Sequence, residues 1–411
     1  MRIHTTENRR KRTAAARVIP ALLLCVFLLG CGVWLTGCGT AEDAEMLPEE
    51  DAAAEDAAAD GTATENLTAE EPVPLTVEEQ LTAYIKTMSL EEKVGQMFLI
   101  RSPIVNPDEA ASKYQPGGMI YFADDFEDKS PAQVRDMTAD CQAASEIPLL
   151  TAVDEEGGDV NRISWYTQFR SEPFKSPQKL YAAGGWRRIV TDTAEKCQLL
   201  SGLGINVNMA PVCDISRDTS SYIYRRTFGM GAVGTSEYVS RVIRIMNQEQ
   251  VGSVLKHFPG YGGNSDTHQG FSVDYRSYEA FETSDLLPFR AGIQAGAGAV
   301  LVSHNIVTCM DPEYPASLSP EVHRILREEL DFEGVIMTDD LVMSAITKAY
   351  GTAEAAVQAV QAGNDMLCCS DYKTQIPAVL DAVRSGKISE ERIDQSVLRI
   401  LLWKHSLGLL D

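Results

Sequence analysis

Positively charged residues are scarce in this chain of 411 residues. Lysine and arginine together number 36, against 59 aspartate and glutamate residues, and the net charge at pH 7 is −23. Binding to nucleic-acid phosphates requires clustered cations, so the composition excludes a nucleic acid as the main partner. Hydrophobic residues make up 44% of the chain, which is typical of globular proteins and excludes collagen-like, coiled-coil and wholly disordered chains.

The chain also lacks the common motifs for binding metals and phosphates. None of its nine cysteines belongs to a C-x-x-C pair or stands beside a histidine at metal-ligand spacing. Those in residues 78–411 are scattered, and we expect buried small hydrophobes there, although the cysteines of an exported protein can also pair. No phosphate-binding loop of the G-x-x-x-x-G-K-[ST] type is present. We therefore expect no metal ion and no cofactor.

Residues 1–38 have the layout of an export signal. The basic residues 9–12 precede an apolar stretch at 18–35. The segment ends in Leu-Thr-Gly-Cys38, which resembles the lipobox of bacterial lipoproteins and implies lipid attachment at Cys38. An uncleaved membrane anchor is the alternative, because about 18 apolar residues approach the length that spans a bilayer. In both cases the remainder is expected to be exported and held at the outer face of the bacterial cell membrane.

Residues 39–77 are predicted to be a disordered linker. Between residues 41 and 76 there are 12 acidic residues and no lysine or arginine. Low hydrophobicity and charge of one sign prevent such a segment from burying a core. We expect an extended spacer that carries no chemistry.

From residue 78 onward, short apolar runs alternate with amphipathic stretches. We predict strands at 94–100, 118–122, 148–153, 205–211, 253–256, 299–303, 334–338 and 365–368. Helical patterns occur at 131–144, 186–203, 237–250, 285–295, 320–330, 353–362 and 397–410. Several strands are continuously hydrophobic, which suits burial on both faces. The repetition predicts an α/β fold, a (β/α)8 TIM-type barrel that forms a single catalytic domain over residues 78–411, with an irregular first repeat.

Polar residues follow many of the predicted strands. They are Asp154, Asp214, Lys256 with His257, Ser303 with His304, and Asp339 with Asp340. Acidic residues at such positions can simply cap the next helix, and Asp214 and Asp340 are expected to be caps or supporting groups. The C-terminal ends of barrel strands open onto one face, where active sites are built. We therefore expect these side chains to gather there.

A glycine-rich loop follows the fifth predicted strand. Residues 256–263 read Lys-His-Phe-Pro-Gly-Tyr-Gly-Gly, and the loop runs on to Gly270. It contains Asp266 and His268, close enough for the carboxylate to orient the ring and favour its protonated form. Such a pair at a barrel mouth can act as general acid and base near neutral pH. Asp-x-His on a glycine-rich loop is weak evidence of catalysis by itself.

Asp339, at the end of the seventh predicted strand, supplies a second carboxylate. A fixed carboxylate opposite a movable acid and base is the minimum for retaining glycoside hydrolysis. Asp154 can accept hydrogen bonds from sugar hydroxyls. Arg162, Arg226 and Lys256 can donate to hydroxyls or to an acyl group.

Six motifs occur in the order of a known family. They are GGMIYF at 117–122, DEEGG at 154–158, GINVNMAPV at 204–212, RTFG at 226–229, KHFPG at 256–260 and TDDL at 338–341. Together they resemble glycoside hydrolase family 3, in its single-domain β-N-acetylglucosaminidase (β-hexosaminidase) branch. The resemblance covers roughly residues 80–411.

The resemblance implies roles for particular residues. Asp339 would be the nucleophile, and His268, paired with Asp266, the acid and base. N-acetylglucosamine would be bound by Asp154, Arg162, Arg226, Lys256 and His257. The branch typically needs no metal. The implied activity is removal of terminal β-linked N-acetylglucosamine from glycans or muropeptides of the cell wall, and we expect a monomer.

Three features differ from the usual pattern of the family. Tyr261 stands where the loop commonly has histidine, and the stretch from Lys256 to His268 is one residue shorter. Asp159 replaces the arginine that commonly follows the two glycines, whereas Arg162 is kept. These differences bear on the preference for groups beyond the first sugar.

Other functions fit the same residues. Phosphorolysis is one. With a histidine as acid and base, the barrel mouth carries one anion fewer, which lets phosphate replace water as the nucleophile. β-Glucosidase activity is another, although larger family members normally take their acid and base from a domain that this chain lacks. A sugar-binding lipoprotein is the non-enzyme alternative, disfavoured because a pure binder has no use for Asp339, Asp266 and His268.

Overall fold

The computed structural model describes residues 74–263 and 272–410. The predicted export signal with Cys38, nearly all of the linker, and the pair Asp266 and His268 lie outside this part of the chain. The first helix, α1, begins at Val77, where the side chain of Thr76 accepts from the amide of Glu79 and the Glu79 carboxylate accepts from the amide of Thr76. Among the described residues, helical structure therefore begins at the predicted end of the linker.

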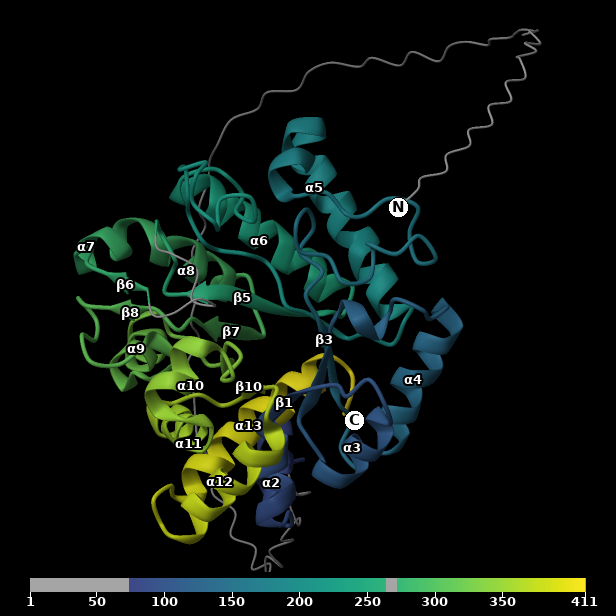
Figure 1. Cartoon of the computed structure of the whole chain (residues 1–411), viewed down its shortest axis with the longest axis vertical. Coiled ribbons are helices and arrows are strands. Elements are labelled where there is room, and N and C mark those ends of the chain that lie inside the picture. The colour runs from purple at the N-terminus through teal and green to yellow at the C-terminus, as the bar shows by residue number, and fades with distance from the viewer. Residues whose placement is uncertain (1–73, 264–271, 411) are drawn as a thin grey trace, which may run out of the picture. The chain divides into compact units, whose positions relative to one another are not determined.

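Eight parallel strands form a nearly closed barrel, as the sequence predicted (Figure 1). They are β1 (Phe98–Arg101), β2 (Gly118–Tyr121), β3 (Leu150–Val153), β4 (Val207–Asn208), β5 (Gly252–Phe258), β7 (Ala299–Val302), β9 (Val335–Thr338) and β10 (Leu367–Cys369). Their order is β10-β1-β2-β3-β4-β5-β7-β9, and a bridge between Met337 and Met366 links the two ends. All C-terminal strand ends therefore face one end of the barrel.

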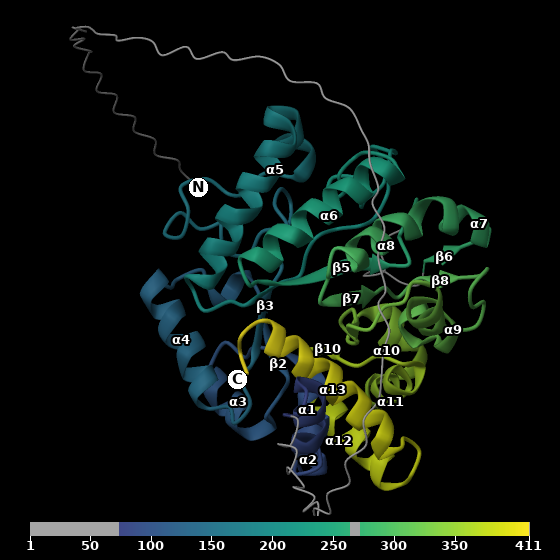
Figure 2. The same cartoon turned by 180° about the vertical axis from the view of Figure 1, so that it is seen from behind.

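The helices surround the strands (Figures 1 and 2). They are α1 (Val77–Ile85), α2 (Leu90–Gln96), α3 (Pro107–Tyr114), α4 (Pro131–Ala143), α5 (Pro177–Ser201), α6 (Ala232–Gln248), α7 (Tyr278–Ala280), α8 (Leu286–Gln294), α9 (Pro320–Arg324), α10 (Ser344–Tyr350), α11 (Thr352–Ala362), α12 (Tyr372–Arg384) and α13 (Glu390–Ser406). Short 3-10 helices are η1 (Ala123–Asp125) and η3 (Ala316–Leu318), and short π-helices are η2 (Phe281–Asp285) and η4 (Ile325–Glu329). The irregular first repeat contains only the eight-residue α3 between β1 and β2.

The first strand begins later than the apolar run predicted. Residues 94–96 belong to α2 and not to β1. The cause is a capping box, in which the Ser89 side chain accepts from the amide of Glu92 and the Glu92 carboxylate accepts from the amide of Ser89. This box stabilises a helix start, and the helix then takes up the first half of the apolar run.

A second, two-stranded parallel sheet was not predicted. β6 (Val273–Asp274) pairs with β8 (Ile306–Val307), which joins the segments that follow β5 and β7. Each strand is only two residues long, so no periodic pattern marks it in the sequence.

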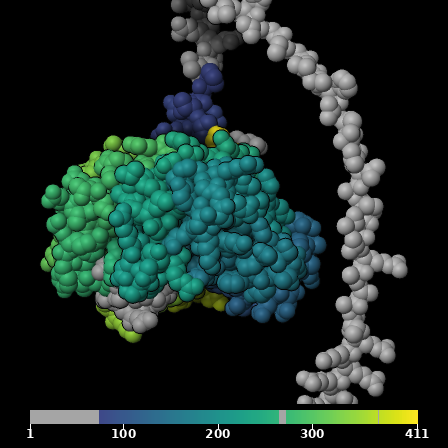
Figure 3. All heavy atoms as spheres, turned by 90° about the horizontal axis from the view of Figure 1, so that it is seen from above, coloured from purple at the N-terminus to yellow at the C-terminus, as the bar shows by residue number. Residues whose placement is uncertain are grey.

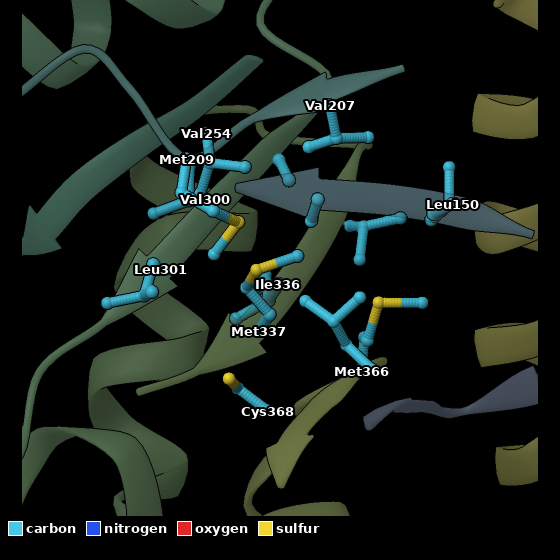
Figure 4. Close-up of a cluster of buried hydrophobic side chains, with 14 of the residues drawn as sticks. Leu150, Val207, Met209, Val254, Val300, Leu301, Ile336, Met337, Met366 and Cys368 are labelled. Carbon is cyan, nitrogen blue, oxygen red and sulfur yellow. The ribbon is translucent and has the colours of Figure 1, made fainter. Parts of the chain in front are cut away.

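The core of the barrel is filled with aliphatic and sulfur-containing side chains. The cluster in Figure 4 gathers residues from six strands and the residues next to them, namely Leu150, Val207, Met209, Val254, Val300, Leu301, Ile336, Met337, Met366 and Cys368. All ten are buried. This packing fills the interior and leaves the C-terminal mouth as the place for a site.

The end of the chain packs beside its first helix. α1 contacts α13, and the surface of α1 lies next to the yellow C-terminal residues (Figure 3). No helix in residues 74–263 and 272–410 combines the length and the apolarity needed to cross a membrane.

A buried lysine lies near the N-terminal ends of the strands. Lys404 on α13 is fully buried, and its Nζ donates to Oε1 of Gln96 at 2.6 Å. Gln96 precedes β1, and its Nε2 donates to the carbonyls of Gln115 and Pro116 just before β2. No carboxylate among residues 74–263 and 272–410 forms an ion pair with Lys404, and burial lowers its pKa to about 7.

We predict that the buried lysine lowers the free energy of unfolding by an amount that depends on pH. Above pH 7 the folded chain holds Lys404 neutral while the unfolded chain still binds the proton, so wild-type stability should rise with pH. Relative to Lys404→Met, the free energy of unfolding of the wild type should increase by up to about 1.4 kcal/mol per pH unit between about pH 7 and pH 10. Urea denaturation across this range measures the difference, and Lys93→Met, which removes a lysine paired with Asp394, is the control. Parallel pH profiles of wild type and Lys404→Met would contradict the prediction.

Candidate active site at the mouth of the barrel

Polar side chains from several strands meet in one cavity at the C-terminal end of the barrel. Its volume is about 560 Å³, within the usual size of small-molecule sites. The polar and aromatic lining consists of Phe122, Asp154, Arg162, Tyr222, Arg226, Lys256, His257, Tyr261, Asp339 and Asp340. The sequence predicted that the strand-end residues among these would gather on one face, and the structure brings them together.

Lys256 lies between two carboxylates. Its Nζ is 2.5 Å from Oδ1 of Asp154 and 2.6 Å from Oε1 of Glu156. Asp154 and Glu156 follow β3, whereas Lys256 belongs to β5, so the ion pairs reach across the barrel mouth. Burial alone would lower the pKa of Lys256, but the two carboxylates outweigh it and raise that pKa above its ordinary value. The ammonium group therefore stays charged in the site.

Glu156 also holds Arg226. The Oε1 and Oε2 atoms of Glu156 accept hydrogen bonds from Nη2 and Nε of Arg226 at 2.7 and 3.0 Å. Burial would raise the pKa of Glu156, but Arg226 and Lys256 hold it well below its ordinary value of 4.5. Glu156 is buried and does not line the cavity. It acts as the shared counter-ion that holds two cations toward the cavity.

The orientation of His257 follows from its two partners. Nε2 lies 3.1 Å from Nη2 of Arg226, and Nδ1 lies 2.7 Å from Oδ2 of Asp214. Because a guanidinium only donates, Nε2 must accept and Nδ1 must carry the proton that it donates to Asp214. Asp214 also accepts from the backbone amides of His257 and Tyr261. It is therefore a supporting group for the cavity wall, one of the two roles that the sequence allowed.

Arg162 is placed by a buried carboxylate in the loop after β3. Glu155 accepts hydrogen bonds from the backbone amides of Arg162, Ile163 and Ser164 and from the Ser164 hydroxyl. This arrangement fixes the backbone of Arg162, whose Nη2 lies 3.9 Å from Oδ2 of Asp154.

Asp339 follows β9, and the next residue, Asp340, is held through its amide, its carbonyl and its carboxylate. The amide of Asp340 donates to Oδ1 of Asp339 at 2.9 Å. The Asp340 carbonyl accepts from Nε2 of buried His304 at 3.1 Å, and its carboxylate accepts from Ser370 and from the amide of Val342. Burial raises the pKa of Asp340. These contacts fix the backbone at the point where the Asp339 carboxylate enters the cavity.

Six of the eight catalytic and sugar-binding residues predicted from the sequence line this cavity: Asp154, Arg162, Arg226, Lys256, His257 and Asp339. The other two, Asp266 and His268, lie outside the described residues, as does Cys38. No role was predicted for Glu155 and Glu156, although both stand in the DEEGG motif. Their hydrogen-bond partners are distant or are backbone amides, which no local spacing reveals.

Within the described part of the chain, no group of three or more His, Cys, Asp or Glu side chains is placed to hold a metal ion. Cys141, Cys197, Cys213 and Cys368 are buried, as expected. Cys309, which lies in the segment after β8, is exposed, contrary to the expectation.

The parallel barrel places a charged, polar cavity at the C-terminal strand ends, which is where barrel enzymes build their active sites. Residues 89–402 match the model of the glycosyl hydrolase family 3 N terminal domain. The chain therefore belongs to glycosyl hydrolase family 3, and the protein is a glycoside hydrolase.

Several relatives are named for their activity. A beta-hexosaminidase of Nitrosomonas eutropha is 32% identical over 299 residues, covering 68% of this chain and 83% of the relative. A beta-hexosaminidase of Tolumonas auensis is 34% identical over 283 residues, covering 66% and 81%. A solved glycoside hydrolase family 3 beta-N-acetylglucosaminidase from Paenibacillus sp. shares 33% identity at a TM-score of 0.73, covering 78% of this chain and 63% of that one.

We predict that Glu156→Gln destabilises the protein and weakens sugar binding. The substitution leaves two buried cations with one anion fewer, which should cost about 3–5 kcal/mol of unfolding free energy and raise KM more than it lowers kcat. Because the pKa of Glu156 is lowered on folding, its stabilisation is present above its ordinary pKa and is lost as the pH falls below it. The difference from wild type should therefore shrink in acid.

Denaturation and kinetics at several pH values measure these effects. Glu237→Gln is the matched control, since it removes a carboxylate from an exposed pair with Arg241 and should change little. Equal behaviour of the two variants would show that Glu156 is not the counter-ion of the site.

Proposed function

We propose that the protein is a retaining exo-β-N-acetylhexosaminidase that removes terminal β-linked N-acetylglucosamine. The alignments with two beta-hexosaminidases cover most of the length of those relatives, and the Paenibacillus enzyme has a similar barrel. The observation that carries the proposal is the cavity, where Asp339 shares one space with the cations Arg226 and Lys256 and with Asp154. A carboxylate beside a dense set of donors and acceptors suits a reaction on a polyhydroxylated sugar.

In this proposal Asp339 attacks the anomeric carbon and forms a covalent glycosyl-enzyme. Asp154 follows β3, which is four strands away from β9 in either direction around the barrel, so Asp154 and Asp339 stand on opposite sides of the mouth. Asp154, Lys256, Arg226, Arg162 and His257 bind the hydroxyl and acyl groups of the sugar. The ionised state of the cations and carboxylates provides strong, charge-assisted hydrogen bonds.

His268, paired with Asp266, is the proposed acid and base. The segment that contains them follows Tyr261, whose side chain lines the cavity, within a few residues along the chain. Protonation of the leaving oxygen and later deprotonation of water are the two steps that such a pair supplies.

The proposed location is the outer face of the bacterial cell membrane, with a lipid on Cys38 and residues 39–77 as a spacer. The layout of residues 1–38 supports export. Fragments of peptidoglycan are the proposed natural substrate, since they are the N-acetylglucosamine glycans on that side of the membrane.

We predict that Asp339→Asn reduces turnover of N-acetyl-β-glucosaminides by on the order of 10³-fold or more, with an unchanged melting temperature. The wild type should prefer chromogenic substrates with the 2-acetamido group over the matching glucosides, and release free sugar whether or not phosphate is present. Near-normal rates in Asp339→Asn would show that Asp339 is not the nucleophile. A sugar phosphate formed only in phosphate buffer would identify phosphorolysis instead.

We predict that His268→Ala affects substrates unequally. A poor leaving group, such as a second sugar, needs a proton, whereas an activated phenolate departs with little help. The activated substrate should therefore give a burst followed by slow turnover, and azide should restore the rate because it requires no deprotonation. Asp266→Asn should give a milder form of the same pattern. Equal losses on both substrates, without burst or rescue, would place the proton donor elsewhere.

A further inference from the structure

Arg276 is held between two buried carboxylates, beside the backbone that follows β5. Its Nε donates to Oδ2 of Asp274 at 3.0 Å, and its Nη1 donates to Oδ2 of Asp285 at 2.9 Å. Asp274 belongs to β6, whereas Asp285 is the last residue of η2. The guanidinium also lies over the ring of Phe281, 4.2 Å from its centroid. Arg276, Asp274 and Asp285 thus form one arginine–carboxylate group that joins β6 to η2.

The backbone after β5 packs directly against this arginine–carboxylate group. A Cβ atom on Gly262 would lie 2.6 Å from Nη2 of Arg276, and one on Gly260 would lie 2.8 Å from Oδ1 of Asp285. The φ angles are +118° at Gly260 and +57° at Gly262, a region that favours glycine. A side chain at either position would therefore push the backbone away from its support.

The cavity wall holds the same stretch of backbone. Between the two glycines, the amide of Tyr261 donates to Oδ1 of Asp214 at 2.7 Å. The ring of Tyr261 meets the rings of His257 and Tyr222 edge to face, with centroids 5.1 and 5.4 Å apart. The backbone at residues 260–262 is thus fixed both by the cavity wall and by the arginine–carboxylate group.

Arg276 contacts both ends of the glycine-rich loop. Gly262 lies at the entrance of the loop, and Asp274 lies in the strand that follows it. Along the chain, Asp266 and His268 stand between these two contacts. The strand at the exit, β6, is in turn paired with β8 (Figures 1 and 2). Bringing both ends of a loop to one point reduces the number of conformations that the loop can adopt.

The carboxylates of the group depend on this cation. Burial raises the pKa of Asp285 to about 6, Arg276 opposes the rise, and the charge of Asp214 adds to it. The side chains of Asp274 and Asp285 are both 3% exposed, so water does little to screen their charges. Loss of the guanidinium fork would therefore loosen the point at which the loop begins and ends.

We propose that Arg276 is a positioning residue for proton transfer, because it holds both ends of the loop that carries Asp266 and His268. Arg276 does not line the cavity formed by the described residues, so it acts on the reaction through His268 and not by touching the sugar. A displacement of about 1 Å can reduce a catalytic rate by about 10²-fold. The inference rests on the proposed function, in which His268 is the acid and base.

The dependence of the rate on the leaving group tests this role. The two substrates are N,N′-diacetylchitobiose, whose leaving group is a sugar that needs a proton, and 4-nitrophenyl N-acetyl-β-glucosaminide, whose leaving group departs with little help. The ratio of their kcat/KM values is measured for each protein. Arg276→Lys keeps the charge but loses the fork that reaches both carboxylates. Gly262→Ala keeps Arg276 and displaces the entrance of the loop.

Each variant has a matched control. Arg327→Lys changes an arginine that is paired with buried Asp365, just before β10 at the N-terminal strand ends. Gly386→Ala changes a glycine with a φ of +75°, where an added Cβ would meet no described atom within 4 Å. Both controls should keep the wild-type ratio.

Arg276→Lys and Gly262→Ala should each lower kcat/KM for the disaccharide about tenfold more than for the nitrophenyl substrate, in the same direction as His268→Ala. The inhibition constant of free N-acetylglucosamine should not change, because the side chains that line the cavity are intact. When Arg276→Lys is added to His268→Ala, the ratio should change little, because Arg276 acts through that histidine.

The outcomes separate the inference from the proposed function. If Arg276→Lys does not fold, Gly262→Ala decides alone. An unchanged ratio in either folded variant, or a further full loss when Arg276→Lys is added to His268→Ala, would overturn the inference and leave the proposed function standing. Equal losses on both substrates in His268→Ala itself would overturn the acid and base assignment, and the inference with it.

Discussion

The site depends on the neutralisation of a buried lysine. The Lys256 side chain is almost fully enclosed, and taking an ammonium group out of water costs several kcal/mol unless anions compensate. Asp154 and Glu156 supply them, and Glu156 in turn neutralises Arg226. Because each charge requires its neighbour, strand β5 and the segments after β3 and β4 must meet in one relative arrangement.

The same constraint prepares the cavity for a polar ligand. The charged neighbours keep Lys256 and Arg226 protonated and Glu156 ionised, so donors and acceptors keep their roles when a sugar replaces water. The hydrogen bond from Nδ1 of His257 to Asp214 fixes the tautomer of this histidine. Such preorganisation reduces the cost of orienting groups during the reaction.

Much of the fold could be predicted because its signals are local. Continuous apolar runs alternating with amphipathic stretches indicate buried parallel strands and covering helices. Parallel topology then places all strand ends together, so Asp154, Lys256 and Asp339 could be assigned to one face before their positions were known. The errors lie where a competing local signal acts, as at residues 94–96, or where a strand has only two residues, as in β6 and β8.

Strand periodicity and chain order set the barrel, the face that bears the site, and most of the charged residues in it, so all three could be predicted from the chain alone. Which of these charges pair depends on the three-dimensional arrangement. Lys256 lies 102 residues from Asp154 along the chain, and Arg226 lies 70 residues from Glu156. Their contacts depend on which side chains face each other across a closed sheet, and that follows from barrel closure and packing, not from spacing. Glu156 therefore became visible as a counter-ion only in three dimensions.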